Sequence, residues 1–76
     1  MKNKLKKFRF LNGELTQQEL AKKVNVSRQT IIAIEKGKFN PSVRLALSIA
    51  KVFKTNVEEI FFLDSMINDS LDNLSR

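Results

Sequence analysis

The chain has 76 residues, of which 42% are hydrophobic and 29% charged, and this balance fits one small globular domain. It contains no cysteine and no histidine, which excludes disulfides, thiolate or imidazole metal sites, and catalysis by either residue. Its formal net charge is +6.

The charge is divided unevenly along the chain. Residues 1–54 hold 13 Lys or Arg against 3 Glu, a net +10, whereas residues 55–76 hold 1 Arg against 5 acidic residues, a net −4. This division favours a polyanion as partner of the basic part, although charge alone fits a basic soluble protein with a solvating tail equally well. No apolar run is long enough to span a membrane or to form the core of a signal peptide, so a cytoplasmic protein is predicted.

Five helices are predicted, because apolar residues recur at helical spacing almost throughout the chain. Thr16 and Glu19 have the spacing of a capping box before the second helix. Ser27 suits the N-cap of the third helix, Gly37 suits its end, and Asn25 tolerates the left-handed conformation of a sharp turn. About three residues join the second and third helices, and such a pair is a helix-turn-helix unit. The predicted helices cover about residues 3–11, 17–24, 28–36, 43–53 and 57–61.

The fourth predicted helix is apolar on nearly every side and leaves only Arg44, Ser48 and Lys51 for water. Such a helix must be buried on most sides. Either the fifth helix or a second subunit is therefore expected to cover it.

The chain after the fourth helix leaves two alternatives open. Residues 60–63 either complete the fifth helix or leave it as a short strand. The acidic segment of residues 64–76 has apolar residues at roughly helical spacing, and it is either a partner-binding helix or a frayed tail. The predicted division is a helix-turn-helix domain over residues 1–63 and an acidic C-terminal tail, helical or disordered, over residues 64–76.

The third predicted helix has an apolar and a polar face. Ile31 and its neighbour Ile34 point inward, which leaves Ile32 on the polar side. An α-helix fits the major groove of B-DNA, where Arg pairs with guanine, Gln pairs with adenine, and an apolar side chain covers a thymine methyl. The alternative is a solvated face with one stray isoleucine. The candidate base-contacting residues are Arg28, Gln29, Ile32 and Ala33.

Polar and cationic residues flank this helix, and they are candidates for contact with DNA phosphates, which position a protein without reading sequence. Gln17 lies in the first turn of the second helix, where free N–H groups also favour a phosphate. Each lysine taken singly is also explained by solubility. The candidate phosphate-contacting residues are Gln17, Lys36, Lys38, Asn40 and Arg44. No catalytic grouping or phosphate-binding loop is present in the sequence, so no enzyme activity, metal or cofactor is expected.

A longer pattern, LTQQELAKKVNVSRQTIIAIEKGKFNPS followed by ALSIAKVF, resembles the lambda-repressor and Cro-like (XRE) family of helix-turn-helix regulators. The resemblance covers about residues 5–61. It implies an all-α, compact five-helix lambda-repressor-like domain, extended in some members by a short two-stranded sheet from the chain ends. Similar family members are homodimers that meet around the fourth and fifth helices, and many repress transcription.

The resemblance also implies roles for single residues in DNA binding. Gln17 and Gln29 fall at positions that contact DNA in the family. Arg28 and Ile32 fall at variable base-facing positions.

Two structural features follow from the same resemblance. Arg9 and Glu35 match an ion pair that ties the first helix to the third. Asn25 and Lys54 stand where the family usually has glycine, and Lys54 would carry some strain there.

The predicted function is sequence-specific binding of double-stranded DNA by a transcriptional regulator. The protein is expected to be a homodimer and a repressor rather than an activator, with the third helix of each subunit in the major groove of a near-palindromic operator. No membrane contact and no small-molecule ligand are expected. Two alternatives stay open, namely an antitoxin-like protein-interaction module with autoregulatory DNA binding, and a helical adaptor that keeps the fold without binding DNA.

Overall fold

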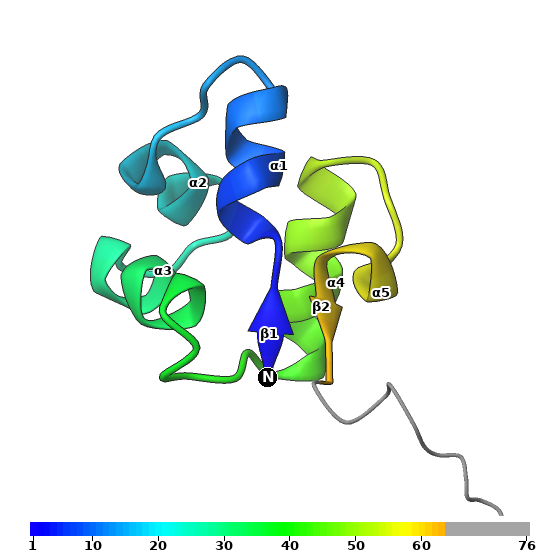
Figure 1. Cartoon of the computed structure of the whole chain (residues 1–76). Coiled ribbons are helices and arrows are strands. Elements are labelled where there is room, and N and C mark those ends of the chain that lie inside the picture. The colour runs from blue at the N-terminus through cyan, green and yellow to red at the C-terminus, as the bar shows by residue number, and fades with distance from the viewer. Residues whose placement is uncertain (64–76) are drawn as a thin grey trace, which may run out of the picture.

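Five helices and a two-stranded sheet make up residues 1–63, the part of the chain that the computed structural model describes (Figure 1). The predicted fold, five helices with a small sheet from the chain ends, is confirmed. The predicted tail, residues 64–76, lies outside the described residues, and so does its interpretation as a helix or a frayed end. In chain order the elements are β1 Lys2–Asn3, α1 Leu5–Leu11, α2 Gln17–Lys23, α3 Arg28–Glu35, α4 Val43–Val52, α5 Val57–Ile60 and β2 Phe61–Phe62.

Short polar side chains fix the starts of α2, α3 and α4. Thr16, Ser27 and Ser42 occupy the three N-caps with extended backbone, and each accepts a hydrogen bond from the backbone N–H three residues further on. Glu19 completes the predicted capping box, because its carboxylate accepts the Thr16 N–H at 2.8 Å. The hydrogen bond from the Thr16 backbone, joined by the Thr16 side chain, lowers the pKa of Glu19 below its ordinary value.

The two strands pair antiparallel and bring both ends of the described chain together (Figure 1). Lys2 lies opposite Phe62, and Asn3 lies opposite Phe61. Of the two alternatives predicted for residues 60–63, the strand is therefore the one observed. The same pairing shortens the first helix, which is predicted from residue 3 but begins at Leu5, because Asn3 belongs to β1.

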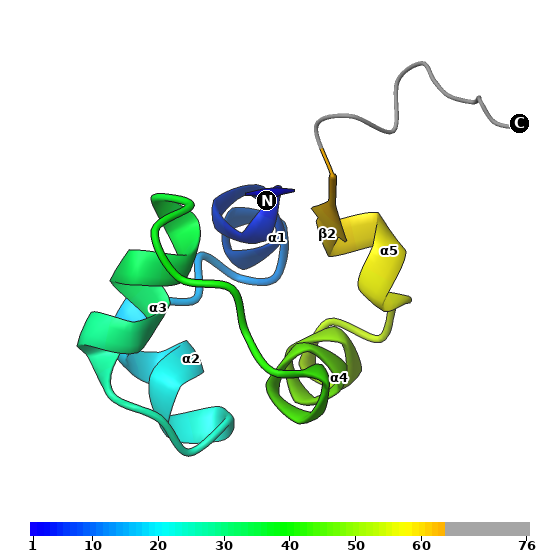
Figure 2. The ribbon, with the colours of Figure 1, turned by 90° about the horizontal axis from the view of Figure 1, so that it is seen from below.

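Every helix contributes to one hydrophobic core. Figures 1 and 2 show the helices grouped around a common centre, with α2 and α3 on one side and α4 and α5 on the other. Burial of each large apolar side chain stabilises the fold by roughly 1.5–3 kcal/mol. α3 supplies two of these side chains, which fixes the direction of its other residues. The largest fully buried side chains are Leu5 from α1, Leu20 from α2, Ile31 and Ile34 from α3, Ile49 from α4 and Ile60 from α5.

α4 is less covered than its sequence predicts. Ala46, Ile49 and Ala50 are buried, but Val43 is 77% exposed and Leu47 is 56% exposed. Of the two covers expected for α4, the fifth helix therefore does not suffice, and the second subunit stays a prediction. The physical reason is the shortness of α5, which has only four residues and cannot cover the whole apolar surface of a ten-residue helix.

Two non-glycine residues predicted to take the left-handed conformation do so. The backbone angle φ is +59° at Asn25, between α2 and α3, and +54° at Lys54, after α4. Asn adopts this conformation readily, whereas at Lys54 it costs roughly 1–2 kcal/mol. Glu14 also has a φ of +57°, which the sequence does not predict, and with Gly13 it makes the turn from α1 to α2.

Candidate nucleic-acid interface

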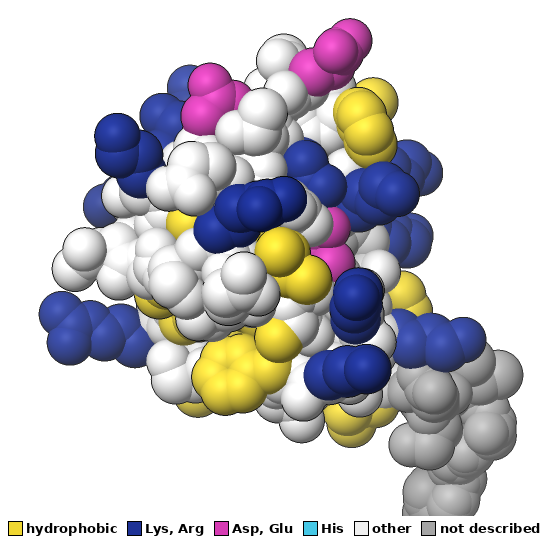
Figure 3. Space-filling view, turned by 90° about the vertical axis from the view of Figure 1, so that its left-hand side faces the viewer, with side chains coloured by type: hydrophobic (Ala, Val, Ile, Leu, Met, Phe, Trp, Pro, Cys, Tyr) yellow, Lys and Arg dark blue, Asp and Glu magenta, His cyan; other side chains and the backbone are white. Residues whose placement is uncertain are grey.

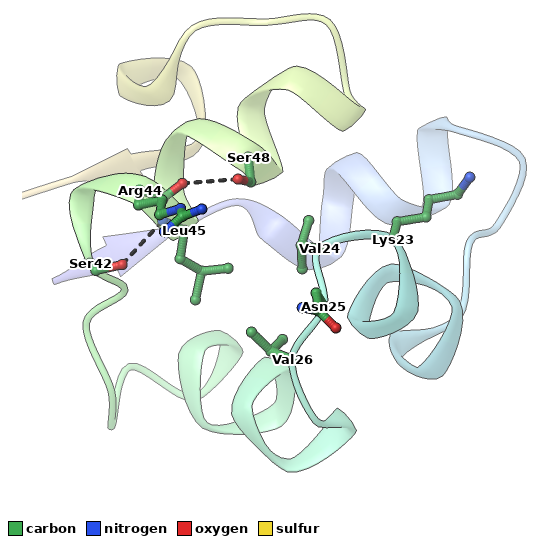
Figure 4. Close-up of a pocket in the computed structure, with 8 residues that line it drawn as sticks. All are labelled: Lys23, Val24, Asn25, Val26, Ser42, Arg44, Leu45 and Ser48. Atoms are coloured by element: carbon green, nitrogen blue, oxygen red, sulfur yellow. Dashed lines mark hydrogen bonds between the residues drawn. The ribbon is translucent and has the colours of Figure 1, made fainter.

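α2, the turn after it and α3 form the predicted helix-turn-helix unit. Within the turn, the Val26 N–H donates to the Ala21 carbonyl oxygen at 3.0 Å. Figure 4 shows the turn facing the start of α4 across a hollow of about 540 Å³, with Val26 and Leu45 on its two sides and Lys23 pointing away. Val26 and Leu45 also pack against the hydrophobic core, and this packing holds the turn in place. The hollow is lined by Lys23, Val24, Asn25, Val26, Ser42, Arg44, Leu45 and Ser48.

α3 directs two of the predicted base-contacting residues into solvent. Ile31 is 0% and Ile34 1% exposed, so this side of the helix is fixed in the core. Arg28 and Gln29, in the first turn of α3, are both exposed. Because Gln29 lies about 160° around the helix from Ile31, its amide is free to meet a partner on the outer side.

Ile32 and Ala33 are half-buried, whereas the sequence predicts that both face outward. Residues one turn apart on a helix are surface neighbours, so Arg28 and Lys36 flank Ile32 along this side of the helix, and both are exposed. The outer side of α3 is therefore less exposed at its middle than at its ends. Ile32 therefore keeps part of its surface exposed for contact with a partner.

An ion pair joins α1 to α3 at the edge of this surface. The Arg9 Nε donates to the Glu35 Oε2 at 2.6 Å, and the Arg9 Nη2 donates to the Oε1 at 3.1 Å. Each of the two side chains is only 9% exposed. The Arg9 Nη1 also donates to the Leu15 carbonyl oxygen at 2.9 Å, so both charged groups are well provided with partners. The ion pair that the resemblance implies is thus present, and it fixes the position of α3 against α1.

Gln17, the first residue of α2, is attached to the same ion pair. Its Nε2 donates to the Glu35 Oε1 at 3.1 Å, and the side chain is half-buried. An amide nitrogen carries two hydrogens, so one remains available for a phosphate. The predicted phosphate-contacting role of Gln17 is therefore compatible with its position, which is fixed by three helices.

The other predicted phosphate-contacting residues lie at the end of α3 and beyond it. Lys36 occupies the C-cap of α3, Lys38 and Asn40 follow on the loop, and Arg44 lies in the first turn of α4. All four are exposed. Figure 3 faces this side of the molecule and shows Lys and Arg side chains spread across it, with acidic side chains mainly at the upper edge. The surface around α3 is therefore positive, as binding of a polyanion requires.

One residue that supports α3 has no clear signal in the sequence. The Asn3 Nδ2 donates to the Ile34 carbonyl oxygen at 2.8 Å, and the Asn3 Oδ1 accepts the Leu5 N–H at 3.1 Å. The first bond is an additional one to a carbonyl group in the last turn of α3, which also accepts the Gly37 N–H at 2.9 Å. Because 31 residues separate Asn3 from Ile34, no local pattern reports this contact.

Residues 1–63 meet the requirements of neither a metal site nor a membrane-spanning helix. Residues 1–63 contain no group of three or more metal-ligating side chains, and none of their helices is long and apolar enough to cross a membrane.

Known proteins are similar in sequence to this chain over most of its length. A helix-turn-helix family model matches residues 5–60. The chain is 61% identical over 64 residues to MJ0272, an uncharacterized HTH-type transcriptional regulator of Methanocaldococcus jannaschii, covering 84% of this chain and 96% of the relative. It is 52% identical to an uncharacterized HTH-type transcriptional regulator of Archaeoglobus fulgidus and 47% identical to another, YgzD, of Bacillus subtilis. These matches cover 84% of this chain, and 90% and 96% of the two relatives. The chain therefore belongs to the XRE-type, lambda-repressor- and Cro-like family of helix-turn-helix transcriptional regulators.

Proposed function

We propose that the protein is a homodimeric transcriptional repressor that reads a near-palindromic operator with α3 of each subunit in the major groove. The observation that carries the proposal is the orientation of α3. Its buried isoleucines face the core, while Arg28 and Gln29 are exposed in its first turn. These two side chains match the hydrogen-bonding edges of guanine and adenine, and the partly exposed Ile32 offers an apolar contact to a thymine methyl.

Phosphate contacts on both sides of α3 would hold the helix in the groove. Gln17 lies at the start of α2, before α3 in the chain, and Lys36, Lys38, Asn40 and Arg44 lie at the end of α3 and beyond it. Such contacts set register and orientation, so they complement the base contacts without repeating them.

An apolar hollow on α4 supports the proposed dimer. It has a volume of about 350 Å³, and none of the side chains that line it is charged. Because a two-fold interface brings the same patch of both subunits together, an uncharged apolar patch is self-complementary, whereas a charged one repels itself. The hollow is lined by Met1, Pro41, Val43, Ala46, Leu47, Val57 and Phe61.

Two subunits joined in this way would place their α3 helices in successive major grooves, about 34 Å apart along the duplex. A dimer bound over a promoter would exclude the polymerase from that DNA, and repression would follow from occupancy alone. No ligand-binding domain is required for this mechanism.

Selection of duplexes from a random pool by the full chain tests the proposal. We expect enrichment of an inverted repeat with half-sites about one helical turn apart, bound by two chains per duplex. The DNA upstream of the protein's own gene is the first natural sequence to search for such a repeat. A chain that fails to bind even a random duplex at low salt, despite a net charge of +10 over residues 1–54, would have no DNA-binding role.

A further inference from the structure

The outer side of α1 carries a second apolar hollow, which differs from the one on α4 by its charged rim. Phe10 is 55% and Leu11 70% exposed, and these two side chains form the apolar part. We refer to this hollow, of about 570 Å³, as the α1 groove. It is lined by Asn3, Lys4, Lys6, Lys7, Phe10, Leu11 and Glu35.

The rim of the α1 groove is positive. Lys4, Lys6 and Lys7 are exposed, and within residues 1–63 none of them has a carboxylate within 4 Å. The Glu35 carboxylate also borders the groove, but it is already engaged by Arg9 and Gln17. An occupant of this groove would therefore combine apolar side chains with negative charge.

The end of the described chain lies beside the α1 groove. In the sheet, Phe62 is opposite Lys2, and the Lys4 Nζ lies 5.8 Å from the centre of the Phe62 ring. Lys4 is also part of the groove. Leu63, the last described residue, therefore follows directly on a residue beside the rim of the groove.

The sequence of that segment has the chemistry that the groove requires. Residues 64–76 contain three Asp and one Arg, a net −2. Their apolar residues are spaced so that they would share one side of a helix, with the carboxylates mostly on the other. The apolar residues are Met66, Ile67, Leu71 and Leu74, and the acidic ones are Asp64, Asp69 and Asp72.

We propose that residues 64–76 bind in the α1 groove of their own subunit. α1 has seven residues, about 10 Å, and 13 residues span about 20 Å even in helical form, so the segment is long enough for the whole groove. A tether this short gives a local concentration in the millimolar range, which favours the contact within one chain over a contact between chains. The uncharged hollow on α4 offers the acidic residues no partner among the side chains that line it.

A spin label near the C-terminus tests this contact directly. Because the chain has no cysteine, Ser75→Cys gives a single site for a nitroxide in an otherwise unchanged full chain. We expect the amide signals of Lys7, Phe10 and Leu11 to lose most of their intensity, and reduction of the nitroxide to restore them. Val43 and Leu47 on α4 are equally exposed apolar residues, and their signals should be unaffected.

Two sets of variants serve as controls for the contact. Lys6→Glu with Lys7→Glu reverses the rim charge, and Leu71→Ser with Leu74→Ser removes apolar anchors without changing the net charge; each pair should restore the α1 signals. A signal loss centred on Val43 and Leu47, or no loss along α1, would overturn the proposal. The same loss in isotope-labelled chains that carry no nitroxide, when they are mixed with separate spin-labelled chains, would overturn the assignment to the same subunit. The measurement needs no DNA, and its outcome is therefore independent of the proposed repressor function.

Discussion

At the scale of single residues, Gln29 and Lys38 represent two kinds of DNA contact. Gln29 is exposed on the outer side of α3, where it meets a base edge in the proposed complex. Gln29→Ala is therefore expected to weaken operator binding by about 1–3 kcal/mol, roughly 5- to 150-fold, with little change for a random duplex. Arg28→Ala should do the same at a different base pair of each half-site.

Lys38→Ala is the matched control for this prediction. A phosphate contact carries no sequence information, so its loss should weaken operator and random duplex alike and reduce the salt slope of binding by about one unit. Equilibrium titrations of both duplexes at several salt concentrations measure the two effects together. Equal losses on both duplexes for Gln29→Ala would mean that this side chain contacts the backbone rather than a base.

The adjacent isoleucines of α3 should respond differently to the same truncation. Ile31 is fully buried, so Ile31→Ala should lower the free energy of unfolding by about 2–5 kcal/mol and leave base preference unchanged. Ile32 is half-buried, so Ile32→Ala should cost less stability and should weaken binding mainly at operators with a thymine at the facing position. Thermal unfolding and binding to thymine-substituted operators distinguish the two. Unchanged base preference in Ile32→Ala, with a stability loss like that of Ile31→Ala, would show that Ile32 serves packing alone.

At the scale of secondary-structure elements, Asn3 connects β1 to both α1 and α3. Asn3→Asp keeps the acceptor for the Leu5 N–H but loses the donor to the Ile34 carbonyl, and it adds a negative charge near the C-terminal end of α3. We expect it to reduce stability by about 1 kcal/mol or more and to accelerate hydrogen exchange at the end of α3. Lys2→Ala, in the same strand, is the control. Unaltered exchange in α3 for Asn3→Asp would show that the sheet alone holds the helix.

How much of the fold and of the candidate site could be predicted depends on how far apart in the sequence the interacting residues are. Thr16 and Ser27 mark helix starts because a cap acts over three residues, and both caps are found where predicted. The side chain of Asn3 bonds to a residue 31 positions away, so only the folded chain reveals it. The exposed Val43 and Leu47 depend on the length of α5, which periodicity does not define to within a turn. The helix-turn-helix and the Arg9–Glu35 ion pair were thus predictable, whereas the Asn3 contact and the exposed side of α4 were not.

At the scale of the whole molecule, the small size of the chain and its exposed apolar surface both favour a dimer. A chain of this length buries only about 60% of its surface on folding, so the stability of one subunit is modest. Val43 and Leu47 leave apolar surface on α4 in water, whereas a partner subunit would cover it. Dimer formation would therefore stabilise the fold as well as align two α3 helices, and unfolding should depend on protein concentration.

Leu47→Asp tests whether this surface joins the two subunits. Leu47 is 56% exposed, so the substitution should leave the subunit folded, but in a dimer it would bury a carboxylate in each subunit against the same apolar patch. We expect sedimentation to show a dimer for the parent and a monomer for the variant. Leu11→Asp, at a residue that is 70% exposed on α1, should leave the dimer intact.

DNA binding by the same variant separates loss of the dimer from damage to α3. Affinity for a single half-site depends on one subunit and should stay the same, because Leu47 is on α4 and the base-contacting residues are on α3. Affinity for the two-half-site operator should fall toward that of the single half-site, because the second contact is no longer intramolecular. A Leu47→Asp chain that still sedimented as a dimer and kept full operator affinity would place the interface elsewhere. The α1 groove has a basic rim that would repel its own copy, so the sheet of β1 and β2 would then be the candidate interface.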